Sequence, residues 1–210
     1  MTRRGIAGVT PILLALLTLL AGCGSLEKSY PVKKDYVFEV SLPVRTVPTD
    51  EKAILLIRRF RTAPPYESKQ FVYRTGALQY ESDFYNVFFS PPAALLADQT
   101  QQWLEASRLV RLVIGAGVQT EATHSLEGRV YALYGDYRRP EDPQAVLGIQ
   151  FFVSQLADTP EIVFHKDYHQ EVPVTGRAPR NLAAAWNRGL QQILTDLEAD
   201  LRAGPFKPGP

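Results

Sequence analysis

Alternating hydrophobic and polar residues run through the second half of the chain in three long stretches. Apolar or aromatic side chains recur there at every second position, as in Val130, Ala132 and Tyr134. Successive side chains of a strand point to opposite faces of a sheet, so this period of two predicts strands with one buried and one solvated face. Turn-rich joints between the stretches predict an antiparallel meander. The three predicted strands are residues 126–137, 145–156 and 161–174.

The first half of the chain predicts shorter strands of mixed character. Residues 52–57 form a nearly continuous apolar run, which is typical of a strand covered on both faces. Residues 36–40 alternate and predict a short edge strand that ends before Pro43. Three further extended segments are predicted at 70–74, 78–81 and 109–114.

Two segments have the spacing of amphipathic helices. Ser90 at the cap position and the prolines after it predict a helix over 91–107. A second helix is predicted over 180–203, because apolar residues recur there at helical spacing. The elements together predict the α+β class: a single two-layer domain with a mixed, mostly antiparallel sheet and two main helices on one face.

The N-terminal residues have the pattern of a lipoprotein signal peptide. Arg3 and Arg4 precede an uncharged, mainly apolar stretch over 6–20, shorter than the about 20 residues of a membrane-spanning helix. The stretch ends in Leu20-Ala21-Gly22-Cys23, which has the form of a bacterial lipobox, and the chain has no other cysteine. We predict cleavage between Gly22 and Cys23 and lipidation of Cys23. The alternative is an ordinary secretory signal with a chance cysteine.

This signal divides the chain into four predicted parts. They are the lipoprotein signal peptide (1–22), a lipidated tether (23–35), the α+β domain (36–203) and a mobile tail (204–210). Among bacterial lipoproteins an aspartate after the cysteine commonly marks retention in the inner membrane, so Gly24 favours the periplasmic face of the outer membrane. Two or more acyl chains would anchor the protein stably.

Charge and composition exclude some partners. The whole chain has 23 Lys and Arg and 22 Asp and Glu. Loss of Arg3 and Arg4 with the signal peptide leaves 21 and 22, a formal charge of −1. A nucleic-acid-binding surface needs an excess of positive charge, so we expect no nucleic acid partner. Since Cys23 is the only cysteine, the mature fold contains no internal disulfide.

The sequence contains no recognisable catalytic or metal-binding motif. It has no Walker loop, no Gly-x-Ser-x-Gly elbow and no His-Glu-x-x-His helix. His165 and His169 fall in a predicted strand, where four residues place them roughly 13 Å apart, too far to share a metal ion. Gly115 and Gly117 lack the third glycine of a dinucleotide-binding loop. We therefore expect no enzyme activity, no catalytic residue, no metal and no cofactor.

The densest aromatic cluster lies between a predicted strand and a predicted helix. Its members are Tyr80, Phe84, Tyr85, Phe88 and Phe89. We predict that Phe84 and Phe88 fill the junction between sheet and helix. Tyr85 and Phe89, together with Tyr80, are candidates for contact with a partner or a lipid, because loops between elements often carry function.

A small basic cluster follows the predicted strand over 52–57. Arg58, Arg59 and Arg61 form it. Contact with phospholipid headgroups and a solvated strand end are both open, and the second is the commoner outcome.

Several of these motifs resemble one lipoprotein family. They are the stretches Phe71-Val72-Tyr73-Arg74, 80–93, Gln102-Trp103-Leu104 and Leu126-Glu127-Gly128-Arg129-Val130. With the lipobox and the chain length, they are similar to the auxiliary lipoproteins of ABC-type transport systems, the family that includes the paraquat-inducible PqiC component. The resemblance spans nearly the whole chain, and its motifs are structural.

The resemblance implies an accessory role in transenvelope lipid transport. In such systems a permease and an ATPase of the inner membrane work with an MCE-domain protein that spans the periplasm. The lipoprotein would tether and dock the far end of that conduit at the outer membrane, and a homo-oligomeric ring would suit the task. Two alternatives stay open: a periplasmic lipid-binding carrier with an apolar cavity, and an envelope assembly or cell-wall regulator lipoprotein.

Overall fold

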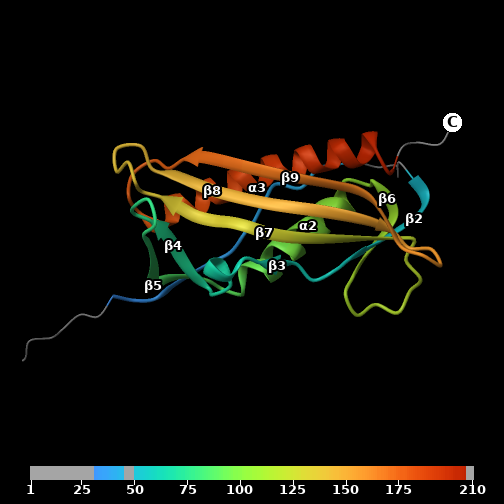
Figure 1. Ribbon diagram of the computed structural model, residues 1–210, viewed down its shortest axis with the longest axis horizontal. Coiled ribbons are helices and arrows are strands. Elements are labelled where there is room, and N and C mark those ends of the chain that lie inside the picture. The colour runs from blue at the N-terminus through green and yellow to red at the C-terminus, as the bar shows by residue number, and fades with distance from the viewer. Residues whose placement is uncertain (1–30, 45–49, 207–210) are drawn as a thin grey trace, which may run out of the picture. The chain divides into compact units, whose positions relative to one another are not determined.

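The predicted meander is confirmed as three long strands that run side by side (Figure 1). Inward-facing residues such as Val130, Ile149 and Phe151 are fully buried, whereas the outward-facing Arg129 is exposed. One face of the meander therefore packs on the core and the other meets solvent. The strands are β7 (His124–Asp136), β8 (Gln144–Gln155) and β9 (Glu161–Pro173).

The computed structural model describes residues 31–44 and 50–206. The chain divides into a unit that ends at Val32 and a unit that begins at Lys33, and every described strand and helix belongs to the second. The predicted signal peptide, the cleavage site at Gly22 and the lipidated Cys23 lie outside the described residues.

β7 is the central strand of the sheet because it pairs with four other strands. One edge pairs with β8, and the other pairs in turn with three short parallel strands. These are β2 (Asp50–Ile57), β3 (Arg61–Thr62) and β4 (Gln70–Arg74), the last two being linked by a 3₁₀ turn, η1 (Pro64–Tyr66). A fourth, β6 (Val110–Gly115), continues the sheet beyond β2, and β5 (Tyr80–Phe88) and β1 (Lys34–Tyr36) continue it beyond β4. The described residues thus form one curled, mixed sheet.

Two helices cover one face of this sheet, as predicted. They are α2 (Pro92–Ala106) and α3 (Pro179–Ala203). α3 packs on β8 and β9, and α2 packs on β6 and touches α3 (Figure 1). α2 begins one residue later than expected: Pro91 occupies the cap position, Ser90 precedes it, and no side chain caps the helix. The fold is α+β with two layers, as the sequence predicts.

An aromatic cluster joins the two layers at the centre of the core. The Trp186 ring of α3 lies edge-on to Phe71 of β4, with 4.9 Å between ring centroids, and 5.5 Å from Phe88 of β5. Its indole Nε1 donates a hydrogen bond to the Val146 carbonyl oxygen at 3.1 Å. All three aromatic side chains are buried, so one residue of α3 holds β4, β5 and β8 together.

The first and fifth strands differ from their predicted ranges. β1 is shifted towards the N-terminus, to Lys34–Tyr36, and the chain leaves the sheet at Val37. β5 extends over nine residues, whereas the sequence predicted only a short piece at 78–81. Aromatic residues favour strands, and β5 continues through the aromatic cluster because it gains parallel pairing with β1 as well as antiparallel pairing with β4.

The C-terminal end of the domain also differs from the prediction. A mobile tail was expected from residue 204, yet Phe206 is fully buried and its ring lies 4.9 Å from that of His124. The Phe206 backbone N–H donates to the Leu201 carbonyl oxygen. The ordered domain therefore reaches at least Phe206, and the rest of the predicted tail lies outside the described residues.

Candidate functional site

A bulge in β5 presents two consecutive aromatic side chains to solvent. The pairing with β4 passes from Phe71 opposite Asp83 to Gln70 opposite Val87, so that residues 84–86 have no partner on β4. Neighbouring residues of a regular strand point to opposite faces, and the bulge breaks that rule. Phe84 is 67% exposed and Tyr85 is 37% exposed, with their rings edge-to-face at 5.2 Å.

The Asp83 carboxylate holds the bulge in shape. Its Oδ1 accepts hydrogen bonds from the backbone N–H groups of Tyr85 (2.8 Å) and Asn86 (3.0 Å). Its Oδ2 accepts from the Tyr73 hydroxyl (2.7 Å) and from Nδ2 of Asn86 (2.8 Å). Partial burial opposes ionisation, but these four donors outweigh it and lower the pKa of Asp83 below its usual value.

The exposed aromatic residues lie where the N-terminal strand joins the sheet. The Lys33 ammonium is 5.9 Å from the centre of the Phe84 ring. Phe89, which is 64% exposed, donates its backbone N–H to the Tyr36 carbonyl oxygen, and its own carbonyl accepts from the Lys69 ammonium at 2.8 Å. We call Phe84, Tyr85 and Phe89 the β5 aromatic patch.

The structure separates the other members of the predicted aromatic cluster from this patch. Phe88 fills the junction between sheet and helix as predicted, being 1% exposed. The same prediction is wrong for Phe84, because the bulge turns its side chain outward. Tyr80 lies at the far end of β5, where its ring is edge-on to Tyr134 and lies under the Arg74 guanidinium.

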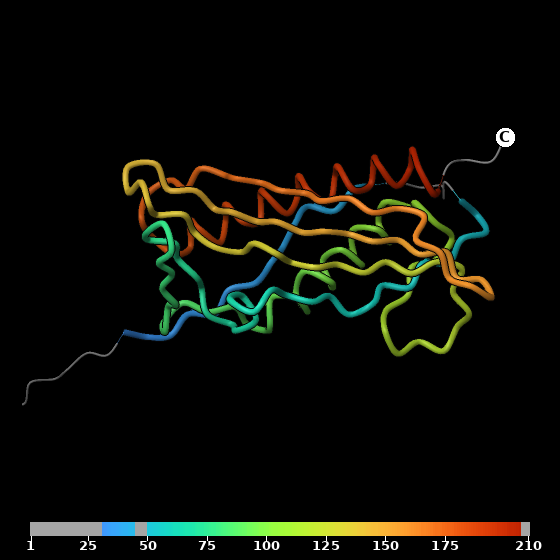
Figure 2. Tube along the Cα trace, viewed as in Figure 1, coloured from blue at the N-terminus to red at the C-terminus, as the bar shows by residue number. Residues whose placement is uncertain are grey.

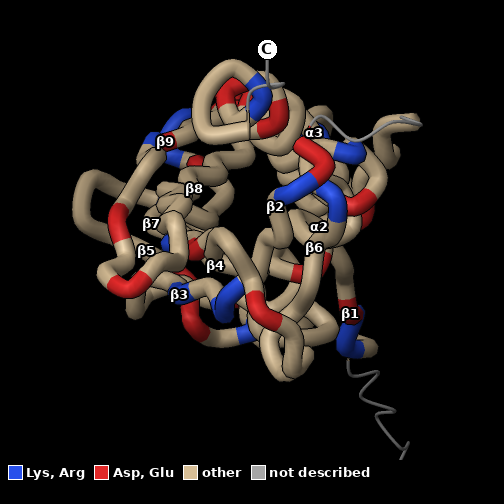
Figure 3. The backbone as a smooth tube through the Cα atoms, turned by 90° about the vertical axis from the view of Figure 1, so that its right-hand side faces the viewer, with Lys and Arg blue, Asp and Glu red and all other residues tan. Residues whose placement is uncertain are grey.

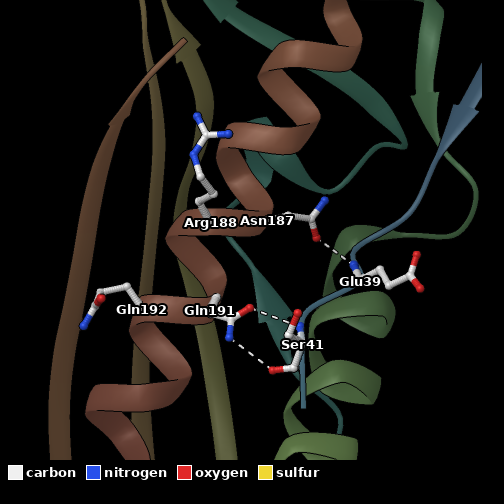
Figure 4. A pocket seen from close by; sticks show the side chains of 6 residues that line it. All are labelled: Glu39, Ser41, Asn187, Arg188, Gln191 and Gln192. Atoms are coloured by element: carbon white, nitrogen blue, oxygen red, sulfur yellow. Dashed lines mark hydrogen bonds between the residues drawn. The ribbon is translucent and has the colours of Figure 1, made fainter. Parts of the chain in front are cut away.

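The chain following β1 is fastened to both helices by side chains, and Figure 4 shows its bonds to Asn187 and Gln191 of α3. Asn187 Oδ1 accepts the Glu39 backbone N–H at 2.6 Å, and Gln191 binds both the N–H and the carbonyl of Ser41, at 3.0 and 3.1 Å. Gln99 of α2, which is buried, accepts the Val40 N–H at 3.1 Å. These amides replace a neighbouring strand, so the backbone polar groups of this segment are satisfied outside the sheet.

We call residues 37–41 the strap. Figure 2 traces its blue path on the helical side of the sheet. The buried Phe38 side chain stacks on Phe88 at 5.2 Å between centroids, which explains the alternation that suggested a strand. A shallow pocket of about 380 Å³ lies beside the strap. Its lining residues are Glu39, Ser41, Asn187, Arg188, Gln191 and Gln192.

The residues that hold the bulge and the strap were missed from the sequence. Asp83, Asn187 and Gln191 were not singled out, although Asn187 and Gln191 are four residues apart and therefore share one face of the predicted helix. Amides at that spacing beside an apolar stripe are a usable signal for a bound extended segment. Nothing in the pattern around Asp83 distinguishes its carboxylate from an ordinary exposed one.

The remaining candidate residues form no site of their own. His165 and His169 lie on β9, both exposed, with their rings stacked on Phe152 and Tyr131. Among residues 31–44 and 50–206, no group of three His, Cys, Asp or Glu side chains could hold a metal ion. None of the helices in this part of the chain is long and apolar enough to span a bilayer.

One acid, Glu127, lies beside the three arginines after β2 in the surface pocket that they line. Arg58 pairs with Glu127 at 3.4 Å, and both side chains are about half exposed. With Arg59 and Arg61 they line an open surface pocket of about 640 Å³. The end-on view of Figure 3 shows basic and acidic residues interspersed around the fold. An exposed ion pair of this kind contributes little to the stability of the fold, which fits a solvated strand end.

The fold and its surface define a single α+β domain with a curled mixed sheet, a fastened N-terminal segment and an exposed aromatic patch. Solved structures share this fold. Protein XCC0632 from Xanthomonas campestris, of the DUF330 family, has a TM-score of 0.68 at 19% identity, over 78% of this chain and 92% of that one. An uncharacterised protein has a TM-score of 0.60 at 14% identity, over 80% and 99%.

A third structure, of the hypothetical protein CT253 from Chlamydia trachomatis, has a TM-score of 0.50 at 11% identity, over 72% of this chain and 99% of that one. No family model matches the sequence, and no curated protein matches it. At these identities the likeness shows the fold alone.

Replacing Asp83 with alanine is expected to lower the free energy of unfolding by about 2–3 kcal/mol, because four donors lose their acceptor. The stability of Asp83→Asn should lie between that of the wild type and that of the alanine variant, since the amide keeps one acceptor oxygen. Urea unfolding followed by far-UV circular dichroism measures both changes.

The Asp83 contribution should also depend on pH. A carboxylate whose pKa is lowered by folding stabilises the protein above its unfolded pKa of about 4, and this stabilisation is lost as the pH falls through the lower folded value. The stability difference between the wild type and Asp83→Asn should therefore shrink below about pH 4. A difference that stays constant down to pH 2 would show that the charge on Asp83 does not hold the bulge.

Proposed function

We propose that this protein is an outer-membrane-anchored auxiliary lipoprotein of an MCE-linked, ABC-type lipid transport system, and that it acts by tethering and docking. The observation that carries the proposal is the lipobox, with Cys23 as the only cysteine of the chain. The motifs similar to those of ABC-type auxiliary lipoproteins support the transport role.

The strap supports a tethering role. Nine residues lie between Cys23 and Lys33, the first residue of the described domain unit, and at about 3.3–3.6 Å per residue the ten steps from one to the other span at most roughly 35 Å. The chain then pairs with β5 and is fastened to α2 and α3 within the next eight residues. An anchor at Cys23 would thus act on a firmly held point of the domain.

The packing of the core favours docking over the alternative of a lipid carrier. A carrier would need a sizeable apolar cavity between sheet and helices. The side chains at that interface, among them Phe151 of β8 and Ile193 and Leu197 of α3, are fully buried. Fully buried side chains in mutual contact leave no room there for an acyl chain.

Replacing Cys23 with serine is expected to abolish lipidation and to release the protein from the outer membrane, because serine offers no thiol for the acyl donor. The measurement is mass spectrometry of the N-terminal peptide together with fractionation of the envelope. Ser25→Ala, two residues away and outside the lipobox, is the matched control and should behave as the wild type. A Cys23→Ser protein that still cofractionates with the outer membrane would contradict the anchor.

Co-purification from detergent-solubilised membranes tests the transport role separately. We expect an MCE-domain protein to co-purify with the wild type and to be reduced with Cys23→Ser. If a correctly lipidated wild type brings down no MCE-domain protein but brings down cell-wall enzymes, the envelope-regulator alternative replaces the transport role.

A further inference from the structure

The β5 aromatic patch has the composition of a membrane-contacting surface. Phe84, within β5, and Phe89, directly after it, are large apolar side chains that are each about two-thirds exposed. Tyr85 adds an amphipathic ring beside Phe84. Aromatic residues of this kind are enriched where a protein meets the headgroup region of a bilayer.

The patch is held rigidly rather than being a loose end. Phe84 and Tyr85 project from the bulge that four hydrogen bonds to Asp83 maintain. Bulges commonly re-aim side chains for a purpose, and a strand without this one would turn one of the two aromatic side chains away. The Asp83 carboxylate thus keeps an apolar ring, Phe84, and an amphipathic ring, Tyr85, at the surface of the domain.

Basic residues surround the patch. Lys33 lies over the Phe84 ring, Lys34 pairs in register with Asn86 of the bulge, and Lys69 binds the Phe89 carbonyl oxygen. All three lysines are exposed. Two exposed acids are near these lysines in the sequence, Asp35 after Lys34 on β1 and Glu67 two residues before Lys69, and the Asp83 carboxylate is occupied by its four donors. Ammonium groups beside aromatic rings suit the anionic headgroups of a phospholipid surface.

The position of the patch along the chain also points to contact with a phospholipid surface. Lys33 is both the first residue of the domain unit and the residue that covers Phe84. The patch therefore lies at the point where the chain leaves the domain towards Cys23, within the roughly 35 Å that the ten extended steps from Cys23 to Lys33 can span. A tether this short gives the bilayer surface a high effective concentration at the patch, so even a weak contact is populated.

We infer that the β5 aromatic patch, with Lys33, Lys34 and Lys69, contacts the phospholipid surface to which Cys23 is anchored, and thereby fixes the orientation of the domain on the membrane. This inference rests on the anchor of the proposed function. It adds a second, non-covalent contact that sets which surfaces of the domain face the periplasm.

Fluorescence of a tryptophan placed in the patch tests the contact. The full-length protein carrying Phe84→Trp is matured in cells, purified and reconstituted into vesicles of phosphatidylethanolamine, phosphatidylglycerol and brominated phosphatidylcholine. Bromine quenches tryptophan only at close range, and the native Trp103 and Trp186 are buried. We expect a blue shift and a loss of emission several-fold greater than for Ile162→Trp, a control on β9 with similar exposure (58%).

Charge-reversal variants test the role of the lysines. In the Phe84→Trp protein, Lys33→Glu with Lys69→Glu should reduce the quenching on vesicles that contain phosphatidylglycerol and change it little on vesicles of phosphatidylcholine alone. Lys52→Glu, at an exposed lysine on β2, is the matched control and should leave the quenching unchanged. A loss of quenching with Lys52→Glu as large as that with the Lys33→Glu/Lys69→Glu double variant would overturn the role of the basic residues around the patch.

The outcomes separate this contact from the anchor. If mass spectrometry shows lipidated Cys23 but Phe84→Trp is quenched no more than Ile162→Trp, the contact is refuted and the anchor stands. If emission changes only when a co-purified protein is added, the patch is a protein-binding surface and the inference is wrong. Quenching with added vesicles in a protein that carries no lipid would support the contact and contradict the proposed function.

Discussion

Replacing Trp186 with alanine is expected to lower the free energy of unfolding by about 4 kcal/mol, within the range measured for deleting a fully buried aromatic side chain. The ring is 0% exposed and contacts Phe71 and Phe88, so its removal leaves a cavity between α3 and the sheet. It also leaves the Val146 carbonyl oxygen without its indole donor. Urea unfolding followed by far-UV circular dichroism measures the change.

Two variants make this result specific. Trp186→Phe keeps most of the ring contacts but loses the Nε1 hydrogen bond, and should cost roughly half as much. Leu112→Ala removes an apolar side chain that is 44% exposed on β6 and should cost less than about 1 kcal/mol. If Trp186→Ala were no more destabilising than Leu112→Ala, the aromatic cluster would not be the joint between the layers.

Replacing Glu198 with alanine is expected to cost about 2–3 kcal/mol, because it breaks a nearly buried polar link between the two helices. Glu198 Oε2 accepts the Trp103 Nε1–H of α2 at 3.1 Å, and Oε1 binds the Arg202 guanidinium at 2.8 Å. Arg202 in turn donates to the Ser107 carbonyl oxygen at the end of α2. Thermal and urea unfolding both report the loss.

A double-mutant cycle apportions the Glu198 effect. Glu198→Gln keeps an acceptor for Trp103 and removes the charge that faces Arg202, whereas Trp103→Phe removes the indole donor together with part of the buried ring. We expect Glu198→Ala and Trp103→Phe to be non-additive, since they act on one hydrogen bond. The matched control is Glu105→Ala, at an exposed position of α2. Additive losses would show that Glu198 does not act through Trp103.

The elements that were predicted well from the sequence are those in which the spacing of apolar residues coincides with the face that is buried in the fold. β7, β8 and β9 alternate because one face of the meander packs on the core and the other meets solvent, and the apolar stripe of α3 follows from its burial against β8 and β9. Residues 52–57 were identified correctly because successive side chains of β2, such as Ile54 and Leu55, are both buried, so that both faces of the strand are covered there. In these elements local pattern and tertiary environment agree.

The candidate site was predicted less well, because its parts depart from regular geometry. Phe84 was assigned to the core on the assumption of an ordinary strand, whereas the bulge set by Asp83 turns it outward. The strap has the alternation of a strand, with Phe38 and Val40 buried, yet its partners are amides of distant helices. Contacts between residues more than a hundred positions apart, such as Glu39 with Asn187, leave no mark in a local pattern.

The strap also decides how the domain would respond to mechanical load. A pull on the chain before Lys33 first acts along β1, whose bonds to the parallel strand β5 are loaded together in shear rather than opened one at a time. The load then reaches Asn187 and Gln191, which lie one turn apart on α3, and Gln99 on α2. Tension is thereby divided between the sheet and both helices, so the attachment can resist forces that would peel a single terminal strand away.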